Sequence, residues 1–281
     1  MRPDALAVIG LGAIGGSLAW QARLAGVPEV IGYSPRLDEC EAALRAGALT
    51  AAAPSPEHAA AGATLVVIAA PPAATLELVD RLGRYLPPGA LLTDVASVKS
   101  AVVARAVQAG LADRFVGGHP LTGTHVTGWA AARPDRFGGC TVYLTPTGGS
   151  DAPSVRAIAG FWREVLEARP VTIGAEAHDR QLAWTSHLPQ AVAYAVAAAL
   201  ASRGLSPDAF GPGARDATRL AASDPDLWVD IFLQNREAVL AALDATASEL
   251  AGVRAAMATG DAARLRALLA PGHAFRQGLD G

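Results

Sequence analysis

The stretch Ala5-Leu-Ala-Val-Ile-Gly10-Leu-Gly12-Ala-Ile-Gly15-Gly-Ser17 decides the fold. Its apolar start predicts a buried strand over residues 6–9, and the glycines that follow open a helical pattern. Glycines at this spacing permit a tight turn, close approach of the backbone to a pyrophosphate and close helix packing, while the helix N-terminus supplies N–H donors. Alone, the motif also suits a glycine-rich turn in another α/β protein. Because it is the first turn of a βαβ unit closing at residues 30–32, we predict dinucleotide binding.

The end of the second predicted strand, Gly32-Tyr-Ser34-Pro-Arg36, bears on which dinucleotide is bound. An acidic residue there would bond the ribose 2′-hydroxyl and repel a 2′-phosphate. Ser34 stands in that place and Arg36 can pair with a phosphate, so the sequence modestly favours NADP over NAD. The alternatives are that Arg36 is a solvated surface charge, or that nearby Asp38 serves as the acid. The predicted cofactor contacts are Gly10, Gly12, Ala13, Ile14, Gly15, Ser34, Arg36 and Pro71.

Strand and helix patterns alternate in the first part of the chain. The predicted strands are residues 6–9, 30–32, 64–70, 90–95, 115–118, 140–145 and 171–173. Such alternation predicts a Rossmann-type, doubly wound α/β domain, in which a mainly parallel sheet carries helices on both faces. Beyond residue 175 only helical patterns remain, over residues 177–202, 209–221, 224–257 and 261–269. We therefore expect a dinucleotide-binding domain at 1–175 and an all-α domain at 176–281.

Composition excludes several classes of protein. With 51 % apolar and 17 % charged residues the chain suits a folded core, and its net charge of −3 offers no field to attract nucleic acid or an anionic membrane. Cys40 and Cys140 form no CxxC or Cys/His cluster, so neither a disulfide framework nor a metal site is predicted. The start of the chain lacks a signal-peptide pattern, and no apolar run is long enough to span a bilayer. We expect a cytoplasmic location.

The segment Thr93-Asp-Val-Ala-Ser97-Val-Lys99-Ser100 follows a predicted strand, at the sheet edge where ligands bind in open α/β folds. Lys99 is the only lysine among 23 basic residues. We hypothesise that its compact ammonium cannot be exchanged for a guanidinium; chance survival is the alternative. Ser97 suits a helix N-cap, a hydroxyl facing the substrate, or both.

His119 lies in Gly117-Gly-His119-Pro-Leu-Thr-Gly-Thr124, at the end of another predicted strand. Its setting lacks the apolar periodicity of a core position, and a near-neutral pKa suits proton exchange with a hydroxyl. A lone histidine is usually structural. Its place at the same sheet edge as the glycine turn and Ser97 favours a catalytic role.

Two residues stand out in the helical part. His187 precedes Pro189 within a long helical pattern, so a kink is expected there that can turn a polar side chain towards a cavity; a histidine satisfied by helix packing is the alternative. Arg219 lies among small and apolar residues, where a guanidinium needs an anionic partner. That partner is either a substrate carboxylate or a protein acid such as Asp224 or Asp230.

Taken together and in this order, the motifs resemble the prephenate/arogenate dehydrogenase family. They are the glycine turn, Asp94-Val-Ala-Ser97-Val-Lys99, Gly118-His119-Pro120 with Gly123-Thr124, His178-Asp179, Ser186-His187-Leu188-Pro189, and Ser223-Asp224-Pro225 with Trp228. The resemblance covers nearly the whole chain. It implies a dinucleotide-binding domain followed by a helical domain that forms a homodimer. Two departures, His125 in place of a frequent acid and Arg215 in place of a frequent lysine, are expected to alter charges at the pocket entrance.

The resemblance also implies the reaction, which is NAD(P)-dependent oxidative decarboxylation of prephenate or arogenate in tyrosine biosynthesis. It implies that His119 and Ser97 contact the ring hydroxyl, that Arg219 binds a substrate carboxylate, and that His187 and Thr124 line the pocket. Hydride transfer and loss of carbon dioxide make the ring aromatic, so the enzyme needs orientation and a base rather than a metal. The choice between prephenate and arogenate stays open.

Two other functions fit parts of the pattern. A β-hydroxyacid dehydrogenase or imine reductase would share the architecture, but would be expected to place a catalytic lysine on the long helix after the sheet domain, where this chain has none. A non-catalytic dinucleotide sensor would need no site residues. The joint presence of Ser97, His119, His187 and Arg219 argues against it.

Overall fold

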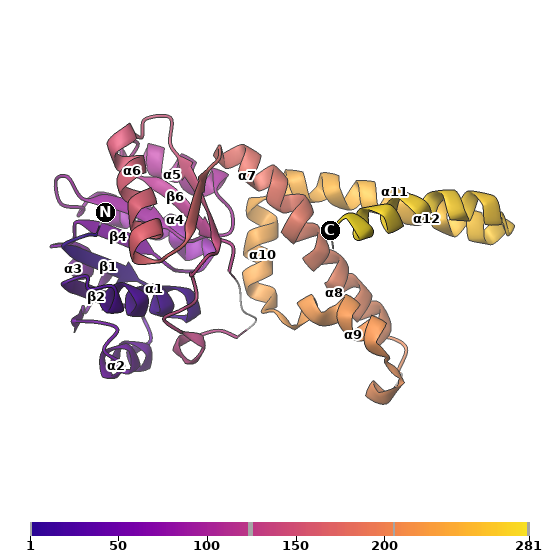
Figure 1. The fold of residues 1–281 in the computed structure, drawn as a ribbon, viewed down its shortest axis with the longest axis horizontal. Coiled ribbons are helices and arrows are strands. Elements are labelled where there is room, and N and C mark those ends of the chain that lie inside the picture. Colours follow the sequence, from indigo (N-terminus) through magenta and orange to yellow (C-terminus); the bar gives the residue numbers. More distant parts are fainter. Residues whose placement is uncertain (1, 123–125, 205, 280–281) are drawn as a thin grey trace.

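The computed structural model describes residues 2–122, 126–204 and 206–279, and places a sheet domain beside an elongated helical part (Figure 1). The main sheet has the strand order β3-β2-β1-β4-β5, and all its pairs are parallel. The elements of this unit are β1 (Ala5–Ile9), α1 (Ala13–Leu24), β2 (Glu29–Tyr33), α2 (Leu37–Arg45), β3 (Ala51–Ala52), α3 (Pro56–Ala60), β4 (Leu65–Ile68), α4 (Pro72–Gly83), β5 (Leu91–Asp94) and α5 (Ser100–Gln108). The predicted Rossmann-type fold is confirmed, and only the two-residue strand β3 was not predicted.

The last three strands form a second sheet of order β6-β7-β8, which contains one antiparallel pair, as the expectation of a mainly parallel arrangement allows. Strands β6 (Val116–Pro120) and β7 (Thr141–Pro146) are antiparallel, whereas β8 (Arg169–Thr172) is parallel to β7. A parallel pair needs a crossover connection, usually a helix. Between β6 and β7 the described residues form only the short helix η1 (Trp129–Ala131), and the two strands pair antiparallel. Helices α6 (Ala152–Gly160) and η2 (Phe161–Val165) supply that crossover before β8.

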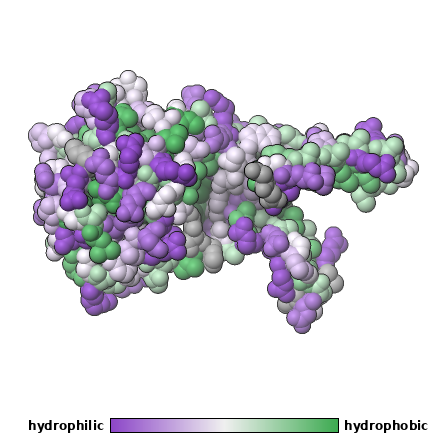
Figure 2. All heavy atoms as spheres, viewed as in Figure 1, coloured by the Kyte–Doolittle hydropathy of each residue, from purple (hydrophilic) through white to green (hydrophobic). Residues whose placement is uncertain are grey.

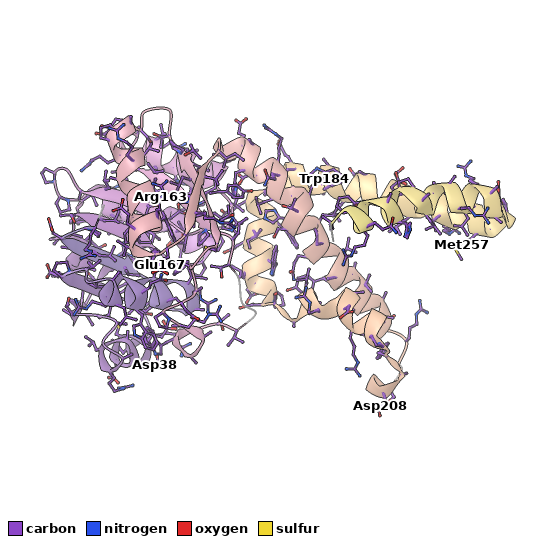
Figure 3. All side chains as sticks on the ribbon, viewed as in Figure 1. Asp38, Arg163, Glu167, Trp184, Asp208 and Met257 are labelled. Carbon is purple, nitrogen blue, oxygen red and sulfur yellow. The ribbon has the colours of Figure 1, made fainter. Side chains whose placement is uncertain are left out.

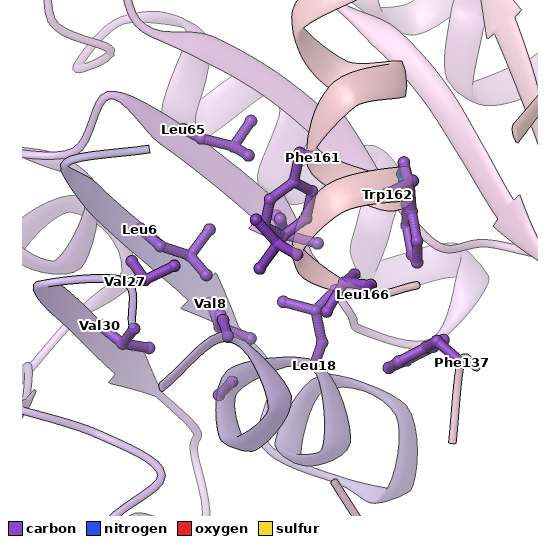
Figure 4. Packing of buried hydrophobic residues seen from close by; sticks show 14 of the residues in the cluster. Leu6, Val8, Leu18, Val27, Val30, Leu65, Phe137, Phe161, Trp162 and Leu166 are labelled. Atoms are coloured by element: carbon purple, nitrogen blue, oxygen red, sulfur yellow. The ribbon is translucent and has the colours of Figure 1, made fainter. Parts of the chain in front are cut away.

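Apolar side chains fill both faces of the main sheet. On one face Leu6 and Val8 of β1 pack with Leu18 of α1 and with Phe161 and Trp162 (Figure 4), and all five are fully buried. Helices α3, α4 and α5 cover the other face. At about 1.5–3 kcal/mol for each large side chain buried, this core fixes the strand ends at which ligands bind.

After Thr172 the described chain is entirely helical. The helices are α7 (Ala175–Leu182), η3 (Ala183–His187), α8 (Leu188–Ala201), η4 (Pro207–Ala209), α9 (Pro212–Thr218), η5 (Arg219–Ala222), α10 (Pro225–Gln234), α11 (Arg236–Thr259) and α12 (Ala262–Gly278). The single helix predicted over 224–257 is wrong, because the structure interrupts it at Asn235. The last helix also runs beyond its predicted end at 269, through Pro271.

The kink expected near Pro189 takes the form of a π-helical turn, η3, directly before α8. Proline has no N–H to donate to the carbonyl four residues earlier, so the regular ladder cannot pass through this point unchanged. The turn ends at His187, whose side chain is 1 % exposed. The proline therefore sets the direction of a buried histidine.

Helices α11 and α12 form a hairpin that projects from the molecule, with Met257 near its far end, whereas Asp38 lies at the lower edge of the sheet domain (Figure 3). Apolar surface lies along these helices (Figure 2), including Leu250, Met257 and Phe275, which are 64 %, 65 % and 71 % exposed. Across the described residues, none of the helices combines the length and the apolar character that crossing a membrane requires.

Candidate active site

The glycine turn between β1 and α1 is shaped to admit a ligand on one side. Gly10 has φ +103°, and a Cβ there would lie 2.3 Å from the Ala69 carbonyl oxygen. A Cβ on Gly15 would lie 1.9 Å from the Gly10 carbonyl oxygen, so both glycines are required by packing. Gly12, in contrast, is the N-cap of α1 with no side-chain cap, and its Cβ would meet nothing nearer than 3.9 Å. The N-terminus of α1, at Ala13 and Ile14, thus has room for a pyrophosphate.

Two carboxylates in the first turn of α2, those of Asp38 and Glu39, lie close to Arg36 at the end of β2. The Ser34 hydroxyl donates to the Glu39 carboxylate at 2.6 Å and is buried. Arg36 pairs with Asp38 at 2.8 Å, and both side chains are more than 60 % exposed. That ion pair raises the pKa of Arg36 and lowers the pKa of Asp38. Arg36 therefore lies where a ribose 2′ substituent is expected, although it is already paired with an acid.

Pro71 lies at the carboxyl edge of the same sheet, as the N-cap of α4. The backbone N–H of Ala73, in the first turn of α4, donates to the Asp230 carboxylate of α10 at 3.3 Å. This contact joins the sheet domain to the helical part. Asp230 is therefore engaged with a helix N-terminus rather than with Arg219.

A buried ion pair fixes the backbone just before His119. Lys99, which is fully buried, pairs with Asp94 and donates to the Gly118 carbonyl at 2.8 Å. Asp94 in turn accepts from the Gly118 N–H at 3.2 Å. Burial lowers the pKa of Lys99, and the Asp94 carboxylate opposes this shift. Both polar groups of residue 118 are thus held from β5 and its following loop.

The glycines at 117 and 118 have no room for a side chain. A Cβ on Gly117 would lie 2.4 Å from the Thr145 hydroxyl, and one on Gly118 would lie 2.6 Å from the Asp94 carbonyl oxygen. Glycine at 118 therefore lets β6 approach β5 closely enough for the Lys99 and Asp94 contacts, and glycine at 117 lets β6 pack against Thr145 of β7.

His119 is the outer end of a hydrogen-bonded chain of three side chains. Its Nδ1 lies 2.8 Å from His178 Nε2, and His178 Nδ1 lies 2.8 Å from the Asp179 carboxylate. That carboxylate also accepts from the N–H groups of Lys99 and Ser100, each at 2.8 Å. Burial alone would raise the pKa of Asp179, but the hydrogen bonds from His178 and Ser100 outweigh it and lower the pKa. Asp179 is therefore an ionised acceptor.

The polarity of this chain sets the tautomer of each ring. A carboxylate only accepts, so His178 carries a proton on Nδ1; with the ring neutral, its Nε2 accepts from His119 Nδ1–H. The remaining nitrogen, His119 Nε2, then bears a lone pair, and no described residue hydrogen-bonds to it. Burial, with the neighbouring His178 and Lys99 acting in the same direction, lowers the pKa of His119 well below its ordinary value. His119 thus presents a neutral acceptor at the sheet edge.

Ser97 does not cap the helix that follows it. Helix α5 begins at Ser100 without a cap from its own N-terminal side chains, and the Asp179 carboxylate of α7 takes that place. The N-cap interpretation of Ser97 is therefore wrong. Its hydroxyl makes no hydrogen bond to any described residue and stays available at the end of β5.

His187 belongs to the same buried cluster, from the helical side. Its Nδ1 lies 3.1 Å from Asn235 Nδ2, and that amide nitrogen also donates to the Asp179 backbone carbonyl at 2.8 Å. Burial lowers the pKa of His187 to about 4. The Nε2 atom is buried without a hydrogen-bond partner among the described residues. Trp228 packs edge-on against the ring, with centroids 6.0 Å apart.

Arg219 stands outside this cluster. It opens η5, is exposed, and makes no ion pair with a described residue. Asp224, proposed above as a protein partner, instead caps α10 by accepting from Asp226 N–H at 3.0 Å. The neighbouring Leu220 carbonyl accepts from Gln190 of α8 at 2.7 Å, one helical turn beyond His187. Thr124 and His125 lie outside the described residues.

The sequence drew attention to His178 and Asp179 without giving them roles, and it missed Asn235. Two adjacent polar, titratable residues shortly after a predicted strand were a usable signal, but the bond between them was not predictable, because neighbouring residues on a helix do not usually face each other. Asn235 carried a weaker one, because asparagine is a poor helix former within a pattern of 34 residues that is long for a single globular helix.

Comparison with known proteins agrees with this architecture. Residues 18–170 match the family profile "Prephenate dehydrogenase, nucleotide-binding domain", and residues 174–271 match "Prephenate dehydrogenase, dimerization domain". The chain is 33 % identical to the prephenate dehydrogenase of Bacillus subtilis, over 98 % of this chain and 76 % of that protein. It is 34 % identical to the cyclohexadienyl dehydrogenase of Zymomonas mobilis, over 91 % and 89 %.

A solved structure resembles the whole molecule. Prephenate dehydrogenase from Aquifex aeolicus, crystallised with hydroxyphenyl propionate and NAD⁺, superposes with a TM-score of 0.89 at 28 % identity over 98 % of both chains. Both domains are therefore matched in order and in three dimensions. The chain is an oxidoreductase that belongs to the prephenate dehydrogenase family.

Proposed function

We propose that this enzyme oxidatively decarboxylates prephenate or arogenate with NAD or NADP, as a step in tyrosine biosynthesis. The relatives named above act on such cyclohexadienyl substrates. The observation that carries the proposal is the chain from Asp179 through His178 to His119, which leaves a lone pair on His119 Nε2. His119 lies near the carboxyl end of β6, and β6 runs beside β5 of the sheet that carries the glycine turn.

His119 acts as the general base. Its neutral Nε2 accepts the hydrogen bond from the ring hydroxyl and takes the proton as the hydroxyl-bearing carbon becomes a carbonyl. His178 and ionised Asp179 hold the imidazole in the required tautomer and stabilise the positive charge that develops on it. Ser97, whose hydroxyl has no hydrogen-bond partner among the described residues, is proposed to contact the same substrate hydroxyl.

The glycine turn fits a dinucleotide, because of its four glycines only Gly12 has no close neighbour, which leaves space in front of the first N–H groups of α1. When bound, the nicotinamide supplies the hydride acceptor. Gly10 and Gly15 shape the turn, Ala13 and Ile14 present the first backbone N–H groups, and Pro71 borders the site from β4. Each of these contacts is a proposal.

The substrate's carboxylates need cationic or donor partners. Arg219 is proposed to bind one of them, because it has no acidic partner among the described residues and lies on the segment that Gln190 ties to α8. His187 and Thr124 are proposed to line the same pocket. Since the described groups do not distinguish a keto acid from an amino acid side chain, prephenate and arogenate both remain candidate substrates.

NADP is proposed as the preferred dinucleotide, by a small factor. Arg36 can turn to a 2′-phosphate because its ion pair with Asp38 is exposed to solvent and therefore weak. The buried Glu39 carboxylate, 3.9 Å from the guanidinium, limits the preference. NAD is therefore expected to support turnover as well.

A homodimer and a cytoplasmic location are also proposed. An apolar groove between α8, α10 and α11 is lined by Ala191, Phe232, Leu233, Arg236, Val239, Leu240 and Leu243, on the part of the chain that matches a dimerization domain. Further exposed apolar side chains lie on α11 and α12, and apolar surface patches are typical of protein interfaces. Both cysteines are free thiols, in keeping with a reducing compartment.

One assay tests the function. Purified enzyme is supplied with prephenate or arogenate and with NAD or NADP, and reduced-cofactor absorbance is followed over time. We expect turnover with at least one pair and release of carbon dioxide in equal amount. Cofactor binding without turnover on either substrate would overturn the proposal and favour a sensor.

A further inference from the structure

The amide of Asn235 has only one orientation that its neighbours allow. One atom of the amide lies 2.8 Å from the Asp179 backbone carbonyl, which can only accept a hydrogen bond. That atom must be the nitrogen, Nδ2. Asn235 is buried at the break between α10 and α11, so packing keeps the amide in place.

The second hydrogen of Nδ2 meets His187. Nδ2 lies 3.1 Å from His187 Nδ1. Because an amide nitrogen can only donate, Nδ1 must be the acceptor and is therefore the unprotonated nitrogen of the ring. A neutral imidazole then carries its proton on Nε2. Protonation of Nδ1 would place two N–H donors against each other, so the cationic form is also disfavoured.

The resulting Nε2–H has no acceptor within the described protein. Nε2 is buried, and a buried donor left unpaired costs about 1–3 kcal/mol. Such a cost is expected to persist where a ligand supplies the missing acceptor. His119, whose tautomer chain starts from the same Asp179, lies in the same cluster.

We propose that Asn235 is a positioning residue that holds His187 as its Nε2–H tautomer, so that this buried N–H donates to an oxygen of the bound substrate. The substrate assignment rests on the proposed function, whereas the tautomer follows from the contacts alone. The lowered pKa of His187 agrees with a ring that stays neutral, and Asp179, His178 and His119 are the other titratable groups facing it.

The tautomer can be measured without turnover. In protein with ¹⁵N-labelled histidine, His187 resonances are assigned by their loss in His187→Gln and read at pH 7. We expect the Nε2–H form in the wild type, and loss of that form in Asn235→Asp, whose carboxylate accepts from Nδ1. An Nδ1–H ring in the wild type would overturn the proposal even if the Asp variant fails to fold.

A double-mutant cycle tests the link to substrate. His187→Ala and Asn235→Ala should each raise KM roughly tenfold with a smaller change in kcat, and the double variant should resemble His187→Ala alone. Additive effects would show that Asn235 acts independently of His187 and would contradict the positioning role. If no substrate is turned over at all, the function proposed above fails while the tautomer measurement still stands.

Discussion

The two ends of the histidine cluster have the same chemistry but opposite polarity. His119, on strand β6, and His187, on a helical π turn, are both buried imidazoles whose pKa values burial lowers. The first is left with a lone pair and the second with an N–H. Both are oriented from Asp179, by its carboxylate through His178 and by its backbone carbonyl through Asn235. Hydrogen-bond polarity, rather than pKa, decides which ring presents a lone pair and which presents an N–H.

The two ends also differ in how they are held. His119 follows Gly117 and Gly118, neither of which has room for a side chain. The N–H and C=O of Gly118 are also both held by the pair of Asp94 and Lys99. His187 is held by one amide at a break between helices. We therefore expect the sheet end to be sensitive to packing and the helical end to be sensitive to single hydrogen bonds.

The largest expected effect comes from removing the base. His119→Asn should lower kcat by a factor on the order of 10² to 10⁴, because the amide cannot take the hydroxyl proton. Dinucleotide affinity, measured by fluorescence titration, should be unchanged, since the glycine turn lies elsewhere on the sheet edge. A variant with near wild-type kcat would show that His119 is structural.

Lowering the pH should reduce the free energy of unfolding, because His187 is buried as a neutral ring. Its pKa of about 4 in the folded state lies below the ordinary 6.5, so the unfolded chain binds more protons between these values. Above pH 6.5 this group therefore does not reduce the free energy of unfolding. As the pH falls towards 4, the free energy of unfolding decreases by roughly 3 kcal/mol, and His119 acts in the same direction.

Urea denaturation at pH 7, 6 and 5 measures this loss. His187→Gln should flatten the slope by at most about 1.4 kcal/mol per pH unit, because one titrating group is removed. Asp179, whose pKa is lowered from 3.8, loses its contribution only at lower pH. Parallel slopes for the two proteins would contradict the assignment.

Arg219→Ala tests the helical side of the pocket. Removing the guanidinium should raise the substrate KM by roughly ten- to a hundredfold with little change in kcat, because a charged hydrogen bond of about 1.5–3 kcal/mol is lost in ground and transition states alike. Arg180→Ala, at an exposed arginine of α7 paired with Glu176, is the matched control. Equal KM values for both variants would remove Arg219 from the site.

Lys99→Arg tests the packing of the sheet end. The larger guanidinium has no space at a fully buried position and should destabilise the protein by about 1–3 kcal/mol, with a lower kcat as residue 118 shifts. The converse exchange Arg45→Lys, at a side chain 70 % exposed, should change neither thermal stability nor turnover. An unaltered Lys99→Arg variant would mean that the single lysine survived by chance.

The smallest effect is expected at the cofactor's ribose end. Asp38→Asn frees Arg36 from an exposed ion pair and should raise the ratio of kcat/KM for NADP to that for NAD by no more than about fivefold. Arg36→Ala should lower the same ratio. If both variants keep the wild-type ratio, Arg36 is a solvated surface charge.

Local patterns were enough for the elements of the sheet domain, because a strand's apolar run and a glycine turn are properties of adjacent residues. They did not specify that β7 runs antiparallel to β6, where the described residues between the two strands form no crossover helix. They also missed the break at Asn235, which depends on partners in α7 and η3. One of the roles considered for Ser97 was the N-cap of α5. Asp179, 79 residues along the chain from Ser100, supplies that cap instead.

The sequence by itself determined the fold class, the glycine turn and the candidacy of His119, since each rests on residues close together in the chain. Only the tertiary structure decided which nitrogen of each histidine carries the proton, because that depends on hydrogen bonds between β6, α7, η3 and the start of α11. A ring's tautomer is set by its neighbours in space, and no pattern along the chain records it.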